Sequence, residues 1–244
     1  MKKLRNMLLT FELCLCAFLF LGYAQKKIQN AAETAVCRYL GEEAEDGIAV
    51  SAKNAVKDDG EKKVALTFDD GPNECYTMEL LEGLKSREVR ATFFLIGKKA
   101  KECPDIVKEI QKEGHLIGNH SYDHVNLSEM TEGAACEQIK KTNQVIEEIT
   151  GEAPQYLRPP FGSYKKNLDA DMNMVEVLWD VDPRDWSVKN TGMVVSRVTG
   201  QVEDGDIILL HDEYATSVAA AFEIIDILKS KGYTFVTVDE LIFE

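Results

Sequence analysis

Short apolar runs alternate with segments of helical periodicity from residue 64 onward, and this alternation is the strongest constraint on the fold. The runs that predict strands are 64–68, 91–96, 115–118, 155–157, 174–179, 207–210 and 234–236. The clearest predicted helices are 77–86, 104–113, 131–150, 191–202 and 216–231. Such alternation predicts an α/β fold with a mainly parallel sheet and helices outside it. A barrel-like closure and a doubly wound sheet both suit this pattern.

Polar side chains follow most of the predicted strands at the point where the strand ends. They are Asp69 and Asp70 after the first strand, Asn119 and His120 after the third, Arg158 after the fourth, Asp180, Asp182 and Asp185 after the fifth, and His211 and Asp212 after the sixth. In β/α barrels, the carboxyl ends of the parallel strands meet at one face, and active sites are built there. We therefore expect these side chains to line one mouth.

The N-terminal part of the chain differs in character from the rest. Basic residues precede an apolar stretch at 7–24, a pattern typical of an export signal or, if uncleaved, of a membrane anchor. Residues 25–62 are polar and predict a linker that is partly helical. We therefore predict a signal or anchor at 1–24, a linker at 25–62 and a catalytic domain at 63–244. Both alternatives for the first segment place that domain outside the cytoplasm, with membrane contact only through 7–24.

The charge and cysteine content exclude two classes of protein. The formal net charge is −14, and so acidic a chain is a poor candidate for binding nucleic acid, which requires lysine and arginine to neutralise phosphates. None of the six cysteines forms a CxxC pair, and the predicted domain holds an odd number of them, Cys75, Cys103 and Cys136. A dense disulfide framework is therefore not expected. The sequence assigns no role to these three residues.

Two motifs have the composition of a metal site. His120 and His124 are two of only four histidines, and their spacing places both on one face of a helical turn. Asp69 and Asp70 are adjacent carboxylates at a strand end, which are costly to keep charged without a nearby cation. Two imidazoles and one carboxylate bind a metal ion and leave positions open for water and substrate. The alternatives are ordinary surface histidines and aspartates that form a turn or cap a helix.

Three further motifs follow later strands. LRPPFG at 157–162 is a rigid loop that presents Arg158, and its alternative is a structural turn with a surface arginine. WDVDPRDW at 179–186 offers three carboxylates and an aromatic wall, or a loop with capping aspartates. IILLHD at 207–212 is a buried strand that runs into His211, which is either functional or an ordinary histidine at a strand end.

Taken together, TFDDGP, HSYDH, RPPFG, DPRDW and LLHD resemble the motifs of the polysaccharide deacetylases in both sequence and order. This family is carbohydrate esterase family four, the NodB-homology domain, and the resemblance runs from about Lys63 to Glu244. It implies a distorted β/α barrel that removes N-acetyl groups from a polysaccharide, first of all N-acetylglucosamine in peptidoglycan. Chitooligosaccharides, N-acetylmuramic acid and acetylated xylan are the alternative substrates. We expect the enzyme to be a monomer.

The resemblance also implies roles for the matching residues. Asp70, His120 and His124 match metal ligands, with zinc as the expected ion and cobalt, nickel or manganese as alternatives. Asp69 matches the general base, and Arg158 matches the residue that pairs with this base.

The remaining matches concern the leaving group and the acetyl group. His211 matches the catalytic acid, with Asp185 as its partner. The backbone N–H of Phe161 would help to hold the oxyanion, although tyrosine is more frequent at this position. Trp186 and Leu209 match the walls of the pocket for the acetyl methyl group.

Two other functions compete with amide hydrolysis. An iron oxygenase also uses two histidines and one carboxylate. The extra carboxylate of Asp69 and the late His211 fit hydrolysis better, because hydrolysis of an amide needs both a base and an acid. A catalytically silent wall-binding protein would retain the fold, but it would have no need of all five motifs.

Overall fold

The computed structural model describes residues 60–163 and 173–243. The expected signal or anchor at 1–24, and all but the last residues of the expected linker at 25–62, lie outside the described residues. Within the described ranges, no helix combines the length and the apolar character that crossing a membrane requires.

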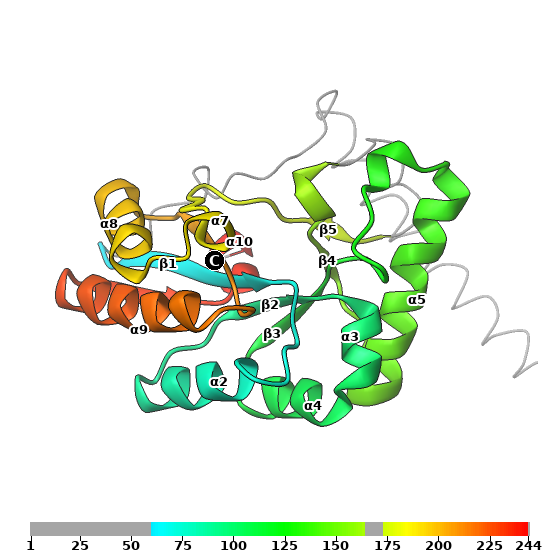
Figure 1. Cartoon of the computed structure of the whole chain (residues 1–244), viewed down its shortest axis with the longest axis horizontal. Helices are drawn as coiled ribbons and strands as arrows, with labels where there is room; N and C mark the ends of the chain where they lie inside the picture. Colours follow the sequence, from blue (N-terminus) through cyan, green and yellow to red (C-terminus); the bar gives the residue numbers. More distant parts are fainter. Residues whose placement is uncertain (1–59, 164–172, 244) are drawn as a thin grey trace, which may run out of the picture. The chain divides into compact units, whose positions relative to one another are not determined.

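A curled sheet of parallel strands forms the centre of the fold, and helices surround it (Figure 1). The strands are β1 (Lys62–Asp69), β2 (Thr92–Leu95), β3 (Leu116–Asn119), β4 (Tyr156–Leu157), β5 (Val175–Glu176), β6 (Ile207–His211) and β7 (Tyr233–Val236). Their order is β5-β4-β3-β2-β1-β6, and β7 pairs with the first half of β1. The register of β1 with β6 places Asp69 beside His211, so the ends of these two strands deliver both motifs to one place.

An irregular segment after β5 connects the two edges of the sheet. The N–H of Val177 donates to Leu157 O of β4 at 2.9 Å, whereas the N–H of Leu209 in β6 donates to Val181 O at 2.9 Å. The chain therefore leaves β4 and reaches β6 within a few residues. This crossing explains why only two residues of the predicted strand 174–179 form β5. The expected distorted barrel with a mainly parallel sheet is confirmed.

The helices agree with the sequence pattern where they are long. The described α-helices are α2 (Thr77–Ser86), α3 (Gly97–Glu102), α4 (Pro104–Lys112), α5 (Glu132–Thr150), α7 (Asp185–Val188), α8 (Thr191–Gln201), α9 (Ala215–Ser230) and α10 (Val238–Phe243). Two short 3-10 helices lie at Leu127–Glu129 and Pro160–Gly162. Each of the five predicted helices begins and ends within one residue of its expected bounds. The unpredicted α3, α7 and α10 are too short to display a helical period.

Strand alternation in β1 decides which side chains reach the site. Leu66 and Phe68 pack into the main apolar core, which also holds residues of α2 and α9. Thr67 and Asp69 therefore point to the opposite face of the strand, because successive side chains in a strand alternate. Both are buried, at 0% and 3% exposure, and both contact Arg158 on that face.

Candidate active site

A cavity of about 460 Å³ opens at the carboxyl ends of the strands. Eight of the ten predicted site residues line it: Asp69, Asp70, His120, His124, Phe161, Trp186, Leu209 and His211. The other two, Arg158 and Asp185, are fully buried behind the lining residues that they contact. The structure therefore brings all ten residues together at one mouth.

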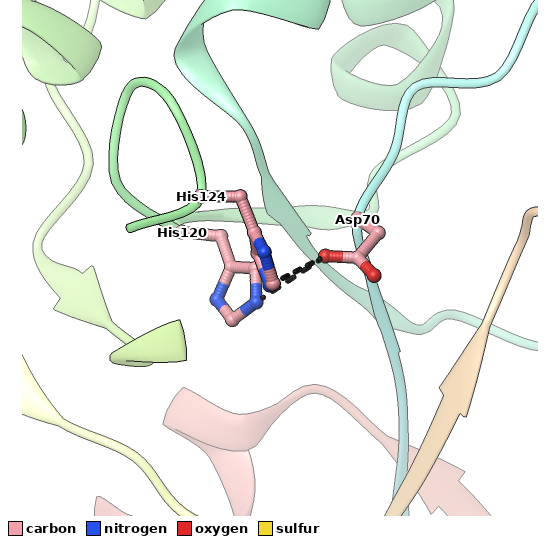
Figure 2. A group of neighbouring side chains, drawn as sticks. All are labelled: Asp70, His120 and His124. Atoms are coloured by element: carbon pink, nitrogen blue, oxygen red, sulfur yellow. Dashed lines mark ion pairs between the residues drawn. The ribbon is translucent and has the colours of Figure 1, made fainter. Parts of the chain in front are cut away.

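Asp70, His120 and His124 form a compact group of side chains, which we call the metal group (Figure 2). Asp70 Oδ1 lies 3.2 Å from His124 Nε2 and 3.5 Å from His120 Nε2. Ligands at the usual distances from a tetrahedral zinc ion are about 3.3 Å apart. Asp70 Oδ1 is also buried without a hydrogen-bond partner in the described structure. This donor set and its spacing fit a divalent metal ion.

The orientation of His120 suits a metal ligand. Its Nδ1 lies 2.6 Å from the carbonyl oxygen of Arg158, which can only accept, so Nδ1 carries the proton. Nε2 therefore presents its lone pair toward Asp70. Burial lowers the pKa of His120, although the charges of Asp69 and Asp70 oppose this effect. The neutral imidazole is the form that binds a metal.

The backbone at these residues adopts a conformation that side chains other than glycine rarely take. Asp70 has a φ of 71° and His124 a φ of 53°, both in the left-handed region. Such conformations persist only when the surrounding structure holds them, and they cluster at functional sites. The Gly71–Pro72 peptide bond that follows Asp70 is cis.

Arg158 holds one oxygen of Asp69 from inside the barrel. Its Nη1 donates to Asp69 Oδ1 at 2.8 Å and to Thr67 Oγ1 at 2.7 Å. Its Nε and Nη2 donate to the carbonyl oxygens of Val177 and Leu178, at 3.1 and 2.9 Å. Burial lowers the pKa of Arg158, and the charge of Asp69 opposes that shift. One oxygen of Asp69 is therefore fixed, while Oδ2 lies on the side of the metal group.

Asp69 and Asp70 thus have different partners although they are adjacent in sequence. Oδ2 of Asp69 is 3.7 Å from His120 Nε2, farther than the Asp70 oxygen is. The strong contact of Asp69 is with the guanidinium of Arg158, whereas Asp70 faces two imidazoles. This division follows from geometry, because Asp69 ends β1 with an inward side chain and Asp70 lies beyond the strand.

Asp185 holds His211 by two bonds. The backbone N–H of His211 donates to Asp185 Oδ2 at 2.9 Å, and Nδ1 lies 2.8 Å from Asp185 Oδ1. Burial alone lowers the pKa of His211. The hydrogen bond and charge of Asp185, together with the charges of Asp69 and Asp70, outweigh burial and raise the pKa to about 9. His211 is therefore an imidazolium at neutral pH in the metal-free protein, with Nε2 as its second ring nitrogen.

We expect Asp185→Asn to lower the pKa of His211, because the neutral amide removes the charge that opposes burial. The pKa can be measured by NMR titration of the imidazole in metal-free protein, since a cation beside Asp70 would itself repel the imidazolium. In the parent protein, the pKa of His211 is raised from the ordinary value of 6.5 to about 9. Stabilisation from this protonated group is therefore complete below about pH 6.5 and is lost as the pH rises through about 9. An unchanged pKa in the variant would contradict the assigned cause.

The three residues matched to the acetyl and oxyanion positions differ in exposure. Leu209 is 4% exposed and lies deep in the cavity, whereas Phe161 and Trp186 are 67% and 51% exposed. Phe161 has a φ of 63° and packs edge-on against the His124 ring, with the ring centroids 4.9 Å apart. Trp186 therefore lies at the mouth of the cavity rather than in its floor.

Several residues of the site carry no signal of their own in the sequence. Trp179, Glu213 and Tyr214 line the cavity although none of them matches a site residue of the family. Asp182 lines it too, as its place after a predicted strand led us to expect. Glu213 and Tyr214 directly follow LLHD, so their place after a strand end was the signal available. Asn119, Asp180 and Asp212 were expected at the mouth but are not among the residues that line the cavity. Asp180 and Asp212 instead accept hydrogen bonds from the Ile207 N–H and the Thr77 hydroxyl.

Comparison with known proteins gives a consistent result. Residues 56–177 match the family model described as polysaccharide deacetylase. The chain is 43% identical over 189 residues to the peptidoglycan-N-acetylmuramic acid deacetylase PdaC of Bacillus subtilis, covering 78% of this chain and 40% of PdaC. It is 39% identical over 180 residues to the peptidoglycan-N-acetylglucosamine deacetylase PgdA of Listeria monocytogenes, covering 74% and 39%. It thus spans about two fifths of the length of these two relatives.

A shorter relative and two solved structures complete the comparison. A peptidoglycan-N-acetylglucosamine deacetylase of Bacillus cereus is 38% identical over 190 residues, covering 75% of this chain and 89% of the relative. The structure of PdaC superposes with a TM-score of 0.73 at 43% identity, covering 76% of this chain and 92% of PdaC's resolved chain. A family-four pseudoenzyme from Bacillus anthracis superposes with a TM-score of 0.71 at 32% identity, covering 75% and 66%.

Proposed function

This chain belongs to the polysaccharide deacetylase family, and from that premise we propose that it hydrolyses the N-acetyl group of an aminosugar in peptidoglycan and releases acetate. The observation that carries the proposal is that two adjacent carboxylates have different partners. Asp69 accepts a hydrogen bond from the buried Arg158, Asp70 faces two histidines, and His211 lines the same cavity. These groups together meet the needs of amide hydrolysis.

We propose that Asp70, His120 and His124 hold one divalent ion, with zinc expected and cobalt, nickel or manganese as alternatives. An ion in such a site supplies Lewis acidity and makes water a nucleophile near neutral pH. The fixed tautomer of His120 and the unpartnered Asp70 Oδ1 support this assignment.

In the proposed reaction, Asp69 is the general base. Arg158 donates a charge-assisted hydrogen bond to Oδ1. Oδ2 is then the atom that takes the proton from water as the new C–O bond forms. Because the guanidinium is held by three further acceptors, the carboxylate cannot rotate away from the cavity without losing its strongest contact.

In the proposed reaction, His211 is the acid. An amide nitrogen is a poor leaving group until it is protonated, so a charged imidazolium is needed beside it. Asp185 engages Nδ1, and the proton is delivered from Nε2 to the amine as the C–N bond breaks. The hydrogen bond and charge of Asp185 raise the pKa of His211, which favours the protonated form that this step requires.

The acetyl group is proposed to lie between the ends of β1 and β6, where Asp69 and His211 are. The backbone N–H of Phe161 would donate to the oxyanion, in line with its place on the cavity wall. The buried Leu209 would contact the methyl group. The half-exposed Trp186 would cover the methyl group from the mouth and contact the sugar.

We predict that His211→Ala lowers the rate of acetate release about 100-fold or more, the usual contribution of a positioned acid. Metal affinity should change little, because His211 is not part of the metal group. Acetate release and a metal titration on the same preparation test this. A parallel loss of metal would make His211 a ligand instead.

The sugar that carries the acetyl group requires a direct test. Named relatives act on either N-acetylglucosamine or N-acetylmuramic acid in peptidoglycan. We propose N-acetylglucosamine, with N-acetylmuramic acid, chitooligosaccharides and acetylated xylan as alternatives. Acetate release by the zinc-loaded full chain should be compared on peptidoglycan, chitooligosaccharides and acetylxylan, and the modified sugar identified by mass spectrometry. We expect peptidoglycan to be the best substrate. Release from acetylxylan alone would contradict amide hydrolysis.

A catalytically silent wall-binding protein is the alternative of another class, and the Bacillus anthracis protein of this fold is described as a pseudoenzyme. The complete set of base, acid and metal group argues against it here. We further propose that the chain acts outside the cytoplasm as a monomer, with 1–24 as signal or anchor, 25–62 as linker and 63–244 as catalytic domain. The substrates named for its relatives belong to the cell wall and support this location.

A further inference from the structure

The backbone around Asp70 is anchored to the segment that joins β2 to α3. The N–H of Ile96 donates to the carbonyl oxygen of Gly71 at 2.9 Å. The Nζ of Lys99 donates to the carbonyl oxygen of Asp70 itself at 2.8 Å. These two bonds fix the two successive peptide groups that follow the metal-site carboxylate, at a residue whose φ of 71° is otherwise unfavourable.

The first residues of α3 also anchor the loop between the two metal-site histidines. The N–H groups of Gly97 and Lys98 donate to the carbonyl oxygens of Ser121 and Tyr122, at 2.9 and 3.1 Å. The first N–H groups of a helix lack partners inside the helix and are free to make such bonds. A Cβ at Gly97 would lie 2.8 Å from the Tyr122 ring and 2.5 Å from Thr142 Oγ1. The close approach of α3 to this loop therefore depends on glycine.

Lys99 is the side chain of α3 that hydrogen-bonds to the backbone of Asp70. Its ammonium group forms an ion pair with Glu213, which lies two residues beyond His211 and lines the cavity. The Lys99 and Glu213 side chains are only 30% and 28% exposed. Lys99 thus connects the Asp70 carbonyl to the loop after β6, and Glu213 limits the positions that the ammonium can take.

We infer that Lys99 is a positioning residue of the metal site. It holds the Asp70 peptide in the left-handed conformation that directs the carboxylate at His120 and His124, and Glu213 orients it. The inference rests on the metal site of the proposed function. Outer partners of metal ligands typically contribute about 10- to 100-fold to metal affinity.

Electrostatics and positioning predict opposite effects of removing this lysine. A cation close to a divalent ion repels it, so loss of the charge alone would tighten metal binding. Loss of the hydrogen bond frees the Asp70 peptide and would weaken metal binding. The direction of the change therefore identifies the role.

The test is a titration of zinc into the metal-free full chain against a competing chelator. We expect Lys99→Met to weaken zinc binding about tenfold or more, and Lys99→Arg to recover much of it, because arginine can reach both acceptors. Lys85→Met is the matched control, since Lys85 pairs with Glu113 on the surface and has no contact with the site. It should bind zinc as the parent does. Thermal unfolding in chelator checks that each variant is folded.

Any of the following outcomes would overturn the inference. Lys99→Met could bind zinc as tightly as the parent or more tightly, or Lys85→Met could weaken binding equally. Either result leaves the proposed metal site intact, because the parent still binds one ion. If the parent itself bound no ion, the metal site of the proposed function would fail, and the inference would fail with it. If Lys99→Met is unfolded, the test is the absorption spectrum of the cobalt-loaded Lys99→Arg protein. A spectrum like that of the parent supports the inference, and an altered spectrum overturns it.

Discussion

Asp69→Asn should reduce acetate release by about three orders of magnitude while zinc binds as in the parent. The amide oxygen of asparagine can still accept from Arg158, which donates to Asp69 Oδ1 at 2.8 Å, so the local structure should persist. The amide has no basic oxygen to take a proton from water. A positioned base contributes about 100- to 10,000-fold to the rate, which sets the expected size of the loss. The measurements are acetate release under single-turnover conditions and zinc affinity on the same preparation.

The control for this variant is its own metal content. If Asp69→Asn released acetate at a near-normal rate, Asp69 would not be the base. If the variant lost zinc together with activity, Asp69 would be a ligand and the division between the two aspartates would be wrong. A thermal unfolding curve checks that the buried Arg158 is still accommodated.

Asp70→Asn should give the complementary result, with loss of zinc binding and, through it, loss of activity. The carboxylate oxygen that faces both histidines, at 3.2 and 3.5 Å, is replaced by a weaker neutral ligand. We expect affinity to fall by more than the about 10- to 100-fold that loss of an outer partner costs. Asparagine tolerates positive φ better than most residues, so the backbone at 70 should be preserved.

Asp69→Asn and Asp70→Asn form a matched pair, because the same isosteric change is made at adjacent positions. High zinc concentration should restore part of the activity of Asp70→Asn and none of the activity of Asp69→Asn. Normal zinc affinity in Asp70→Asn would contradict its role as a ligand.

Most of the barrel could be predicted from the sequence, because the long helices begin and end at residues with clear local signals. Helix α5 begins after Thr131, whose hydroxyl accepts from the Ala134 N–H, and ends at Gly151 with a φ of 83°. Both signals are readable from residue type. The strand that the sequence predicts at 174–179 is too long, because the hydrogen bonds of the segment after β5 switch from β4 to β6. No local pattern encodes such a switch.

The site was predictable as a set of strand-end residues, but its internal order was not. That Arg158 reaches inward to Asp69 depends on contacts 89 positions apart in the sequence. The family resemblance implied different roles for Asp69 and Asp70, and the geometry shows that the two carboxylates have different partners. The pairing of Lys99 with Glu213, 114 positions away, had no sequence signal, because lysine and glutamate side chains ordinarily lie in solvent.

The fold alone does not settle activity, because a pseudoenzyme has the same architecture at a TM-score of 0.71. The functional argument therefore rests on the side chains. The buried arginine, the bonded His211–Asp185 pair and the metal group are all in place around one cavity.

Metal dependence of acetate release is the most direct test of the account. The full chain should be stripped with a chelator, then titrated with zinc while acetate release from peptidoglycan is measured. We predict negligible release from the stripped protein and recovery that saturates at one zinc ion per chain. Undiminished release in the presence of the chelator, with no bound metal detected, would contradict the account.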